Sequence, residues 1–254
     1  MIGRVRLRVA DLERVRSYYE ATIGLRALAE DGDTVTLGAD TPLVELVGDP
    51  AAQPAPPGST GLFHLAILVP DRPELARSIQ RVVGSGERFT GASDHFVSEA
   101  LYLRDPEGNG IELYRDRPRE EWEHEPDGQL RMGTVALDLH DVVTETPHDE
   151  DHGMADGTIM GHVHLHVSDL GEAEAFYVDR LGLEVTVRGY PGALFVSHDG
   201  YHHHVGLNTW QGAHGPAPPP GSRGLIDYEL VLPDVPEGPI TDPAGNGVVV
   251  RSVQ

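Results

Sequence analysis

The stretch that decides the fold is SDHFVSEALYLRDPEGNGIEL, which runs from Ser93 to Leu113. Its middle, residues 105–110, reads Asp-Pro-Glu-Gly-Asn-Gly and predicts a tight turn, because proline presets φ and glycine permits positive φ. The flanking residues 100–103 and 111–114 are apolar or alternate in the manner of strands. The stretch therefore predicts a β-hairpin.

Three side chains of this stretch could carry chemistry: the imidazole of His95, the phenol of Tyr102 and the carboxylate of Glu112. Tyr102 and Glu112 belong to the two predicted strands, and alternation places Glu112 on the face opposite Ile111 and Leu113. A plain hairpin with an exposed glutamate would explain the stretch equally well. The rest of the chain must decide between these interpretations.

One unit, a short strand followed by an aspartate and usually by an amphipathic helix, recurs four times. The four strands begin near residues 3, 63, 161 and 226. The position seven residues before the aspartate holds, in chain order, Arg4, His64, His162 and Asp227. Only the second and third units therefore offer a histidine at this position.

The repeat divides the chain into units at residues 1–49, 60–115, 159–210 and 222–254, with a linker at 116–158. Asp11 and Asp169 stand where helix N-caps are expected, and Gly24 and Gly182 where C-caps are expected. A complete unit is predicted to run β-α-β-β-β. The fourth unit is truncated, because too few residues follow Asp234 to form a helix of normal length before the next Asp-Pro-Ala-Gly-Asn-Gly turn.

Seven residues of the opening stretch match the signature of the extradiol ring-cleavage dioxygenases, and the chain resembles that family there. The matching residues are His95, Leu101, Tyr102, Asp105, Pro106, Gly108 and Glu112. Ser93 departs from the pattern, which usually has Gly, Asn, Thr, Ile or Val at its place. The units also resemble those of the vicinal oxygen chelate superfamily, which includes glyoxalases, extradiol dioxygenases and antibiotic-sequestering proteins. This resemblance implies an α+β fold in which units pair and line cup-shaped β-barrels with their first and last strands.

Resemblance and repeat together imply one metal site. Its ligands would be the first-strand residues His64 and His162 and the last-strand residue Glu112, whereas the fourth unit has Val249 at the place of the acid. We expect these three residues to bind Fe(II), with Mn(II) as an alternative because the same imidazole and oxygen donors suit it. The set requires the second unit to pair with the third, and leaves the first to pair with the fourth. Taken singly, each ligand has a simpler explanation: a core histidine, one of a row of alternating strand histidines, or a surface glutamate.

A run of three histidines, His202 to His204, lies near the end of the third unit. The resemblance implies that the acid–base histidine of the dioxygenases lies here. We expect it to be His204, the second histidine of the pair before Val205, rather than His203. Strand alternation lets only one of the pair face the metal. A loop metal chelator or a surface patch is the alternative interpretation. The resemblance further implies that His95 and Tyr102 hydrogen-bond the oxygens of the substrate.

The function implied by the resemblance is that of an Fe(II)-dependent extradiol dioxygenase of the catechol 2,3-dioxygenase type. Such an enzyme takes a catechol and dioxygen and cleaves the ring next to the two hydroxyls. A protein that only sequesters a small molecule, such as an antibiotic, would not need His95, Tyr102 and His204 together. A glyoxalase-like metal-dependent lyase or isomerase would need a second carboxylate near residues 203–207, where the sequence has none.

The composition argues against several classes of partner. A formal net charge of −22 and a pI of about 4.8 disfavour nucleic acid and anionic membranes. No segment approaches the roughly 18 consecutive apolar residues of a membrane span, and the N-terminal residues begin as a strand without a signal-peptide core, so we expect a cytoplasmic protein. The absence of cysteine leaves histidines and carboxylates as metal ligands. A homo-oligomer is compatible with the sequence.

Charged residues alternate on the first strands of the two outer units. Arg4, Arg6 and Arg8 recur at every second residue of one strand, and Asp227 and Glu229 do so on the other. We expect these rows to meet and to close the second cup with Arg–carboxylate pairs and no metal. The alternative is that both rows face solvent.

Overall fold

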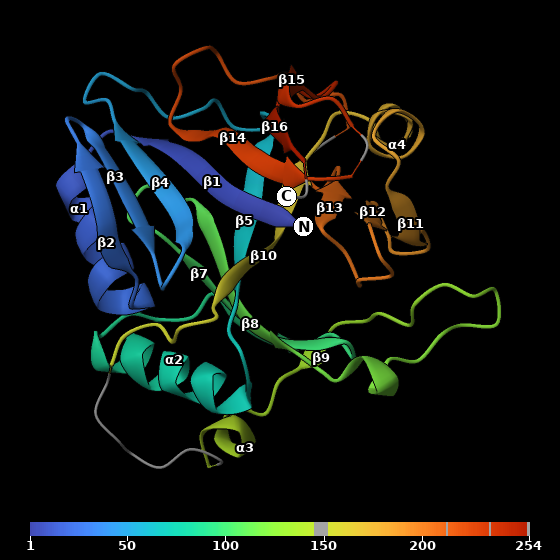
Figure 1. Cartoon of the computed structure of the whole chain (residues 1–254), viewed down its shortest axis with the longest axis horizontal. Coiled ribbons are helices and arrows are strands. Elements are labelled where there is room, and N and C mark those ends of the chain that lie inside the picture. The colour runs from blue at the N-terminus through green and yellow to red at the C-terminus, as the bar shows by residue number, and fades with distance from the viewer. Residues whose placement is uncertain (145–151, 212, 234, 253–254) are drawn as a thin grey trace.

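The computed structural model describes residues 1–144, 152–211, 213–233 and 235–252. Its strands form two curved sheets, one of seven strands and one of nine (Figure 1). The expected α+β fold with repeated units is therefore confirmed. Asp234, the aspartate of the fourth repeat, lies outside the described residues.

The order of strands shows which repeats pair. The seven-stranded sheet contains, in spatial order, β15 (Gly238–Thr241), β16 (Gly247–Arg251), β14 (Gly224–Val231), β1 (Ile2–Val9), β4 (Pro42–Gly48), β3 (Thr34–Gly38) and β2 (Arg26–Asp31). The nine-stranded sheet contains β11 (Glu184–Val187), β12 (Ala193–Ser197), β13 (Val205–Asn208), β10 (Ile159–His166), β5 (Gly61–Leu68), β8 (Gly110–Asp116), β7 (Ser98–Arg104), β6 (Gly91–Asp94) and β9 (Val135–Ala136). The first strands of the repeats thus pair antiparallel, β1 with β14 and β5 with β10.

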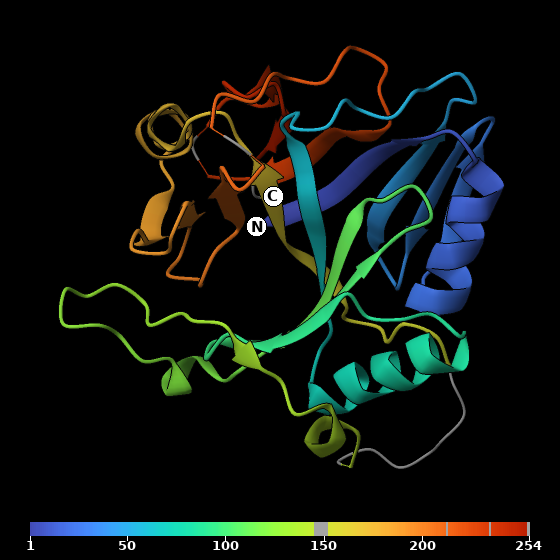
Figure 2. The same ribbon diagram turned by 180° about the vertical axis from the view of Figure 1, so that it is seen from behind.

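Helices lie on the outer sides of the two sheets. They are α1 (Leu12–Tyr18), α2 (Arg72–Gly84), α3 (Leu139–Thr144) and α4 (Leu170–Glu174), with short helical turns η1 (Tyr19–Ile23), η2 (Arg119–Glu121) and η3 (Ala175–Arg180). Helix α1 packs on β4, α2 on β8 and α4 on β12 and β13, while α3 lies against α2 (Figures 1 and 2). The described part of the chain contains no helix long and apolar enough to cross a membrane.

The two predicted N-caps and the C-cap at Gly24 are present, whereas the second of these helical segments has its C-cap at Leu181, one residue before the expected Gly182. Asp11 accepts a hydrogen bond from the backbone N–H of Arg14 at 3.1 Å, and Asp169 accepts one from that of Glu172 at 2.9 Å. Such caps satisfy donors that the first helical turn leaves free. At the other end, Gly24 adopts φ = 92°, a conformation that glycine reaches without steric cost.

The turn of residues 105–110 joins β7 to β8, as the sequence predicts. Asp105 organises it, because its carboxylate accepts hydrogen bonds from the backbone N–H groups of Glu107 and Asn109. Gly110 is required for close packing, since a Cβ on it would lie 2.0 Å from the carbonyl oxygen of Phe63. The missing side chain lets β8 run directly beside β5, and so brings Glu112 close to His64.

The charged rows of the outer repeats meet within the seven-stranded sheet. Arg6 contacts both Asp227, at 2.8 Å, and Glu45 on β4, at 2.7 Å. Arg4 contacts Glu45 at 2.7 Å and Glu229 at 3.6 Å. The expected Arg–carboxylate pairs are therefore present, and Glu45 is a partner that the sequence analysis did not identify.

Parts of the linker pack on the nine-stranded sheet. β9 extends the sheet by pairing with β6, and Trp122 is 8% exposed, with its indole N–H donating to the carbonyl oxygen of Arg117. Helix α3 follows, held in part by an ion pair of 2.6 Å between Arg72 and Asp141. Residues 145–151 of the linker lie outside the described residues.

Candidate metal centre and substrate cavity

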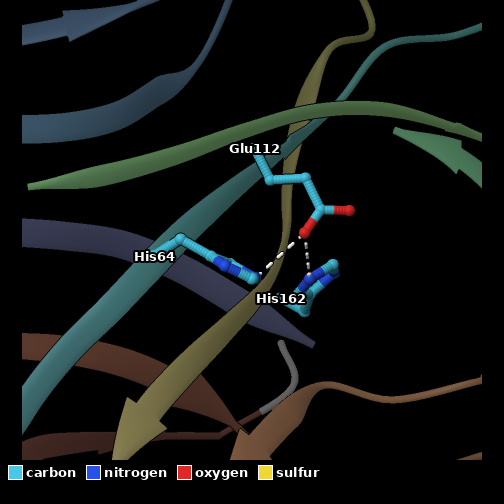
Figure 3. Close-up of side chains that lie close together, drawn as sticks. All are labelled: His64, Glu112 and His162. Carbon is cyan, nitrogen blue, oxygen red and sulfur yellow. Dashed lines mark hydrogen bonds and ion pairs between the residues drawn. The ribbon is translucent and has the colours of Figure 1, made fainter. Parts of the chain in front are cut away.

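Three buried side chains converge at the centre of the nine-stranded sheet (Figure 3). His64 comes from β5, Glu112 from β8 and His162 from β10, and one ligand atom of each lies within 4.8 Å of the others. Glu112 Oε2 is 2.9 Å from His64 Nε2 and 3.2 Å from His162 Nε2. The three residues that the sequence analysis selected as ligands are therefore neighbours in space.

The register of the three strands explains this meeting. Ala66 is paired with Glu112 on one side and with His162 on the other. His64 lies two residues before Ala66 on the same face of β5. The small side chain of Ala66 leaves open the space toward which the three ligands point.

The donor set fits a divalent metal ion. Two imidazoles and one carboxylate on one face are the ligands of non-haem iron centres that keep positions open for further ligands. His64 Nε2 is buried and has no hydrogen-bond partner among the described residues, although the Glu112 carboxylate is nearby. Buried polar atoms are rarely left without a partner, and a bound cation would supply one here. The group is the one cluster of this kind in the described ranges.

Burial keeps the imidazoles of His162 and His203 neutral near pH 7. Burial lowers the pKa of His162 to about 4 against the opposing effect of the Glu112 carboxylate. Burial, together with the neighbouring imidazoles of His162 and His202, also lowers the pKa of His203 well below its ordinary value. A neutral imidazole has a free lone pair, which is what metal ligation and proton acceptance both require.

The centre opens into a cavity of about 420 Å³. Its wall beyond the three ligands is largely aromatic and apolar, with Phe63, Met132, Tyr190, Phe195 and Trp210. Such a cavity suits a flat apolar ring, with the polar groups gathered at its metal-binding end.

His95 and Tyr102 also line the cavity and form a hydrogen-bonded pair. His95 Nδ1 donates to the carbonyl oxygen of Gly133 at 2.7 Å, so its Nε2 is the acceptor for the hydroxyl of Tyr102, also at 2.7 Å. Tyr102 faces Glu112 across the hairpin. Burial raises the pKa of the Tyr102 phenol well above its ordinary value, and the nearby Glu112 adds to the effect, so the hydroxyl keeps its proton.

The expectation that His204 faces the cavity is wrong, because His203 occupies that place. His203 lines the cavity, and its ring centroid is 4.1 Å from that of His162. His204 instead accepts hydrogen bonds at Nδ1 from the Ser197 hydroxyl, at 2.9 Å, and from the backbone N–H of His198, at 3.2 Å. The cause is local: β13 begins only at residue 205, and the chain bends at residues 202 and 204, so regular alternation does not hold there.

Other residues of the cavity were left open by the sequence or not predicted from it. His164 lies two residues beyond His162 on β10, and its ring centroid is 5.1 Å from that of His64. The alternating histidines of this strand were a visible signal. Trp210 and Phe63, whose ring centroids are 5.4 Å apart, had no such signal, because isolated aromatic residues are common in cores.

The amino-terminal part of the chain, residues 1–113, matches the family described as the Glyoxalase/Bleomycin resistance protein/Dioxygenase superfamily. A protein of Bacillus subtilis (strain 168) named catechol-2,3-dioxygenase is 45% identical over 237 residues, which are 91% of this chain and 82% of that relative. The chain belongs to this superfamily.

Solved structures share the fold of this superfamily member. A crystal structure of a Bacillus subtilis subsp. subtilis str. 168 protein matches with a TM-score of 0.67 and 12% identity, covering 99% of this chain and 84% of that one. Glyoxalase I from Zea mays matches with a TM-score of 0.59 and 18% identity, covering 98% and 91%. At these identities the likeness concerns the fold alone.

Proposed function

We propose that this protein is an Fe(II)-dependent extradiol dioxygenase that cleaves a catechol-type ring next to its two hydroxyls. The observation that carries the proposal is the position of His64, Glu112 and His162 at the base of an aromatic cavity that also holds His95 and Tyr102. The 45% identical relative named catechol-2,3-dioxygenase supports the same chemistry. Mn(II) is an alternative metal for the same donors.

His64, His162 and Glu112 would hold the metal, which when bound supplies a centre where the two catechol oxygens and dioxygen can meet. The wall residues Phe63, Phe195 and Trp210 would hold the ring and exclude water. Both atoms of dioxygen enter the product, and the carbon–carbon bond beside one hydroxyl is broken. The product is a ring-opened hydroxymuconic semialdehyde.

The chain's own residues would handle the protons. The Tyr102 hydroxyl donates to His95, which leaves the phenol oxygen free to accept a hydrogen bond from a substrate hydroxyl. His203, beside His162 in the cavity wall, would accept a proton at one stage and return it at a later one. These assignments replace His204 by His203 as the proposed acid–base residue.

The test is oxygen uptake by anaerobically purified, Fe(II)-loaded protein on addition of a panel of catechols. We expect uptake together with a yellow ring-opened product, and loss of both in Glu112→Gln. A muconate-type product would contradict cleavage outside the two hydroxyls. Tight catechol binding without oxygen uptake would instead favour a sequestering protein.

A further inference from the structure

Next to the cavity, three side chains form a hydrogen-bonded series that leads from His203 to the last residue of strand β8, Asp116. His203 Nδ1 lies 2.7 Å from His202 Nδ1, and His202 Nε2 lies 2.9 Å from Asp116 Oδ1. His202 is fully buried, and the Asp116 side chain is 24% exposed. None of the three belongs to the set of metal ligands.

With Asp116 ionised and His202 neutral, the hydrogen-bond geometry fixes the positions of the protons in this series. An ionised carboxylate can only accept, so His202 must donate to Asp116 from Nε2. A neutral His202 then has a bare Nδ1, which can only accept. The proton between the two imidazoles therefore belongs to His203 Nδ1, and His203 Nε2 is left with a lone pair.

We propose that Asp116 and His202 are positioning residues that hold His203 in the tautomer protonated at Nδ1, with Nε2 presented to the cavity as a proton acceptor. The inference deepens the proposed function, on which its catalytic meaning rests. It gives a role in the site to Asp116, at the end of β8, and to His202, which does not line the cavity.

The surroundings of the pair hold it in place. The Tyr201 hydroxyl donates to Asp116 Oδ1 at 3.3 Å and lies 2.7 Å from the Tyr114 hydroxyl. The indole of Trp122 covers His202, with ring centroids 5.5 Å apart. Trp122 of the linker thus helps to bury His202, and in a water-poor setting hydrogen bonds orient their partners more strongly.

A conservative series separates positioning from packing. Phenylalanine at residue 202 would fill the space without accepting a hydrogen bond, whereas the carbonyl of glutamine can still accept from His203 Nδ1. We expect His202→Phe to lower kcat by about tenfold or more with little change in KM, because small misplacements of a reacting group cost up to ~100-fold. His202→Gln should keep most of the activity, and both variants should keep the wild-type metal content.

A double-mutant cycle shows whether the effect passes through His203. In a His203→Phe background, the further change His202→Phe should alter kcat by less than about twofold, since the residue to be positioned is gone. An equal loss with and without His203 would overturn the proposal. So would wild-type kcat in His202→Phe.

A measurement that needs no activity decides the tautomer itself. In metal-free protein with ¹⁵N-labelled histidines, long-range ¹H–¹⁵N spectra distinguish protonated from bare ring nitrogens, and signals missing from His202→Phe and His203→Phe assign the two rings. We expect His203 protonated at Nδ1 and His202 at Nε2. His203 protonated at Nε2 would overturn the proposal whatever the enzymatic activity. Correct tautomers in a protein without oxygen uptake would count against the proposed function alone.

Discussion

Glu45 on β4 and Glu112 on β8 occupy the same position in the two sheets. Glu45 pairs with Arg6 of β1, and Glu112 pairs with Ala66 of β5, each two residues beyond the repeat position that holds Arg4 or His64. Both carboxylates are buried. The two halves of the molecule therefore share one framework, but only one half combines the acid with histidines.

The two sheets differ in the first-strand residue that pairs with the acid on one side and with the neighbouring first strand on the other. In the nine-stranded sheet this residue is Ala66, which has no charged group to place between Glu112 and His162. In the seven-stranded sheet it is Arg6, whose guanidinium contacts Glu45 at 2.7 Å and Asp227 at 2.8 Å. A side-chain cation thus bridges the two positions that hold Glu112 and His162 in the other sheet.

Paired changes at the matching acids test this relationship. Glu112→Gln should strongly reduce the metal bound per chain, because an amide is a much weaker ligand than a carboxylate for a divalent ion. Glu45→Gln should keep it, since Glu45 lies in the other sheet. Elemental analysis of Fe(II)-reconstituted proteins measures both. Metal lost from Glu45→Gln and kept by Glu112→Gln would mean that the metal centre lies in the seven-stranded sheet.

Removing Asp227 should destabilise the fold without affecting the metal. Its loss leaves Arg6 with one carboxylate instead of two. Buried pairs cost about 3–5 kcal/mol when broken, but the Arg6 side chain is 34% exposed, so we expect about 1–2 kcal/mol for Asp227→Ala. For a chain of this length that is a fall in Tm of about 2–8 °C. Unchanged Tm with reduced iron would contradict the structural role.

The sequence predicts those features that depend on local rules. The turn at residues 105–110 needs particular φ angles, and the helix caps Asp11 and Asp169 need particular side chains, so both are visible in the residue types. The repeat then places His64 and His162 at equivalent points of their strands. Residues far apart in sequence thus become candidates for one site, and in the structure they adjoin Glu112.

The features that the sequence did not predict depend on departures from regular structure or on tertiary packing. His203 rather than His204 faces the cavity because the chain bends before β13 begins. A bend of this kind cannot be predicted from the alternation of residues along a strand. Glu45 was not predicted, because the first unit has Arg4 at the repeat position instead of a histidine, and the sequence therefore offered no reason to look for an acid beside it. The position of Trp122 over His202 depends on the path of the linker, for which the sequence has no periodic signal.

Exchange of the two neighbouring histidines tests the corrected assignment. His203→Phe should lower turnover by about a hundredfold or more, the usual scale for a lost acid–base group, while the iron content stays the same. His204→Phe should leave turnover within a few-fold, because His204 bonds to Ser197 away from the cavity. Steady-state kinetics with metal analysis measures both. The reverse pattern would restore His204 as the acid–base residue.

Salt should stabilise the chain. Its 41 acidic residues outnumber its 19 basic ones, which gives a net charge of −22 and strong self-repulsion in the compact state. Moderate salt screens this repulsion, since the Debye length falls from about 10 Å at 0.1 M to about 3 Å at 1 M. We expect Tm to rise with KCl concentration over this range. A steady fall would mean that screening of the surface ion pairs outweighs screening of the net charge.

Lower pH should destabilise the metal-free protein, because its buried imidazoles resist protonation in the folded state and accept protons on unfolding. Burial lowers the pKa of His162 to about 4 and that of His204 to about 3, whereas both return toward the ordinary value of 6.5 on unfolding. Between those values the unfolded chain binds more protons than the folded one, so stability is full above pH 6.5 and falls as the pH decreases. Each such histidine costs up to about 1 kcal/mol per pH unit in this window.

Urea unfolding at pH 7.5 and 5.5 measures the slope, and His204→Phe should make it shallower because its ring cannot titrate. An unchanged slope in His204→Phe would contradict the assignment of this pH dependence to the buried imidazole of His204.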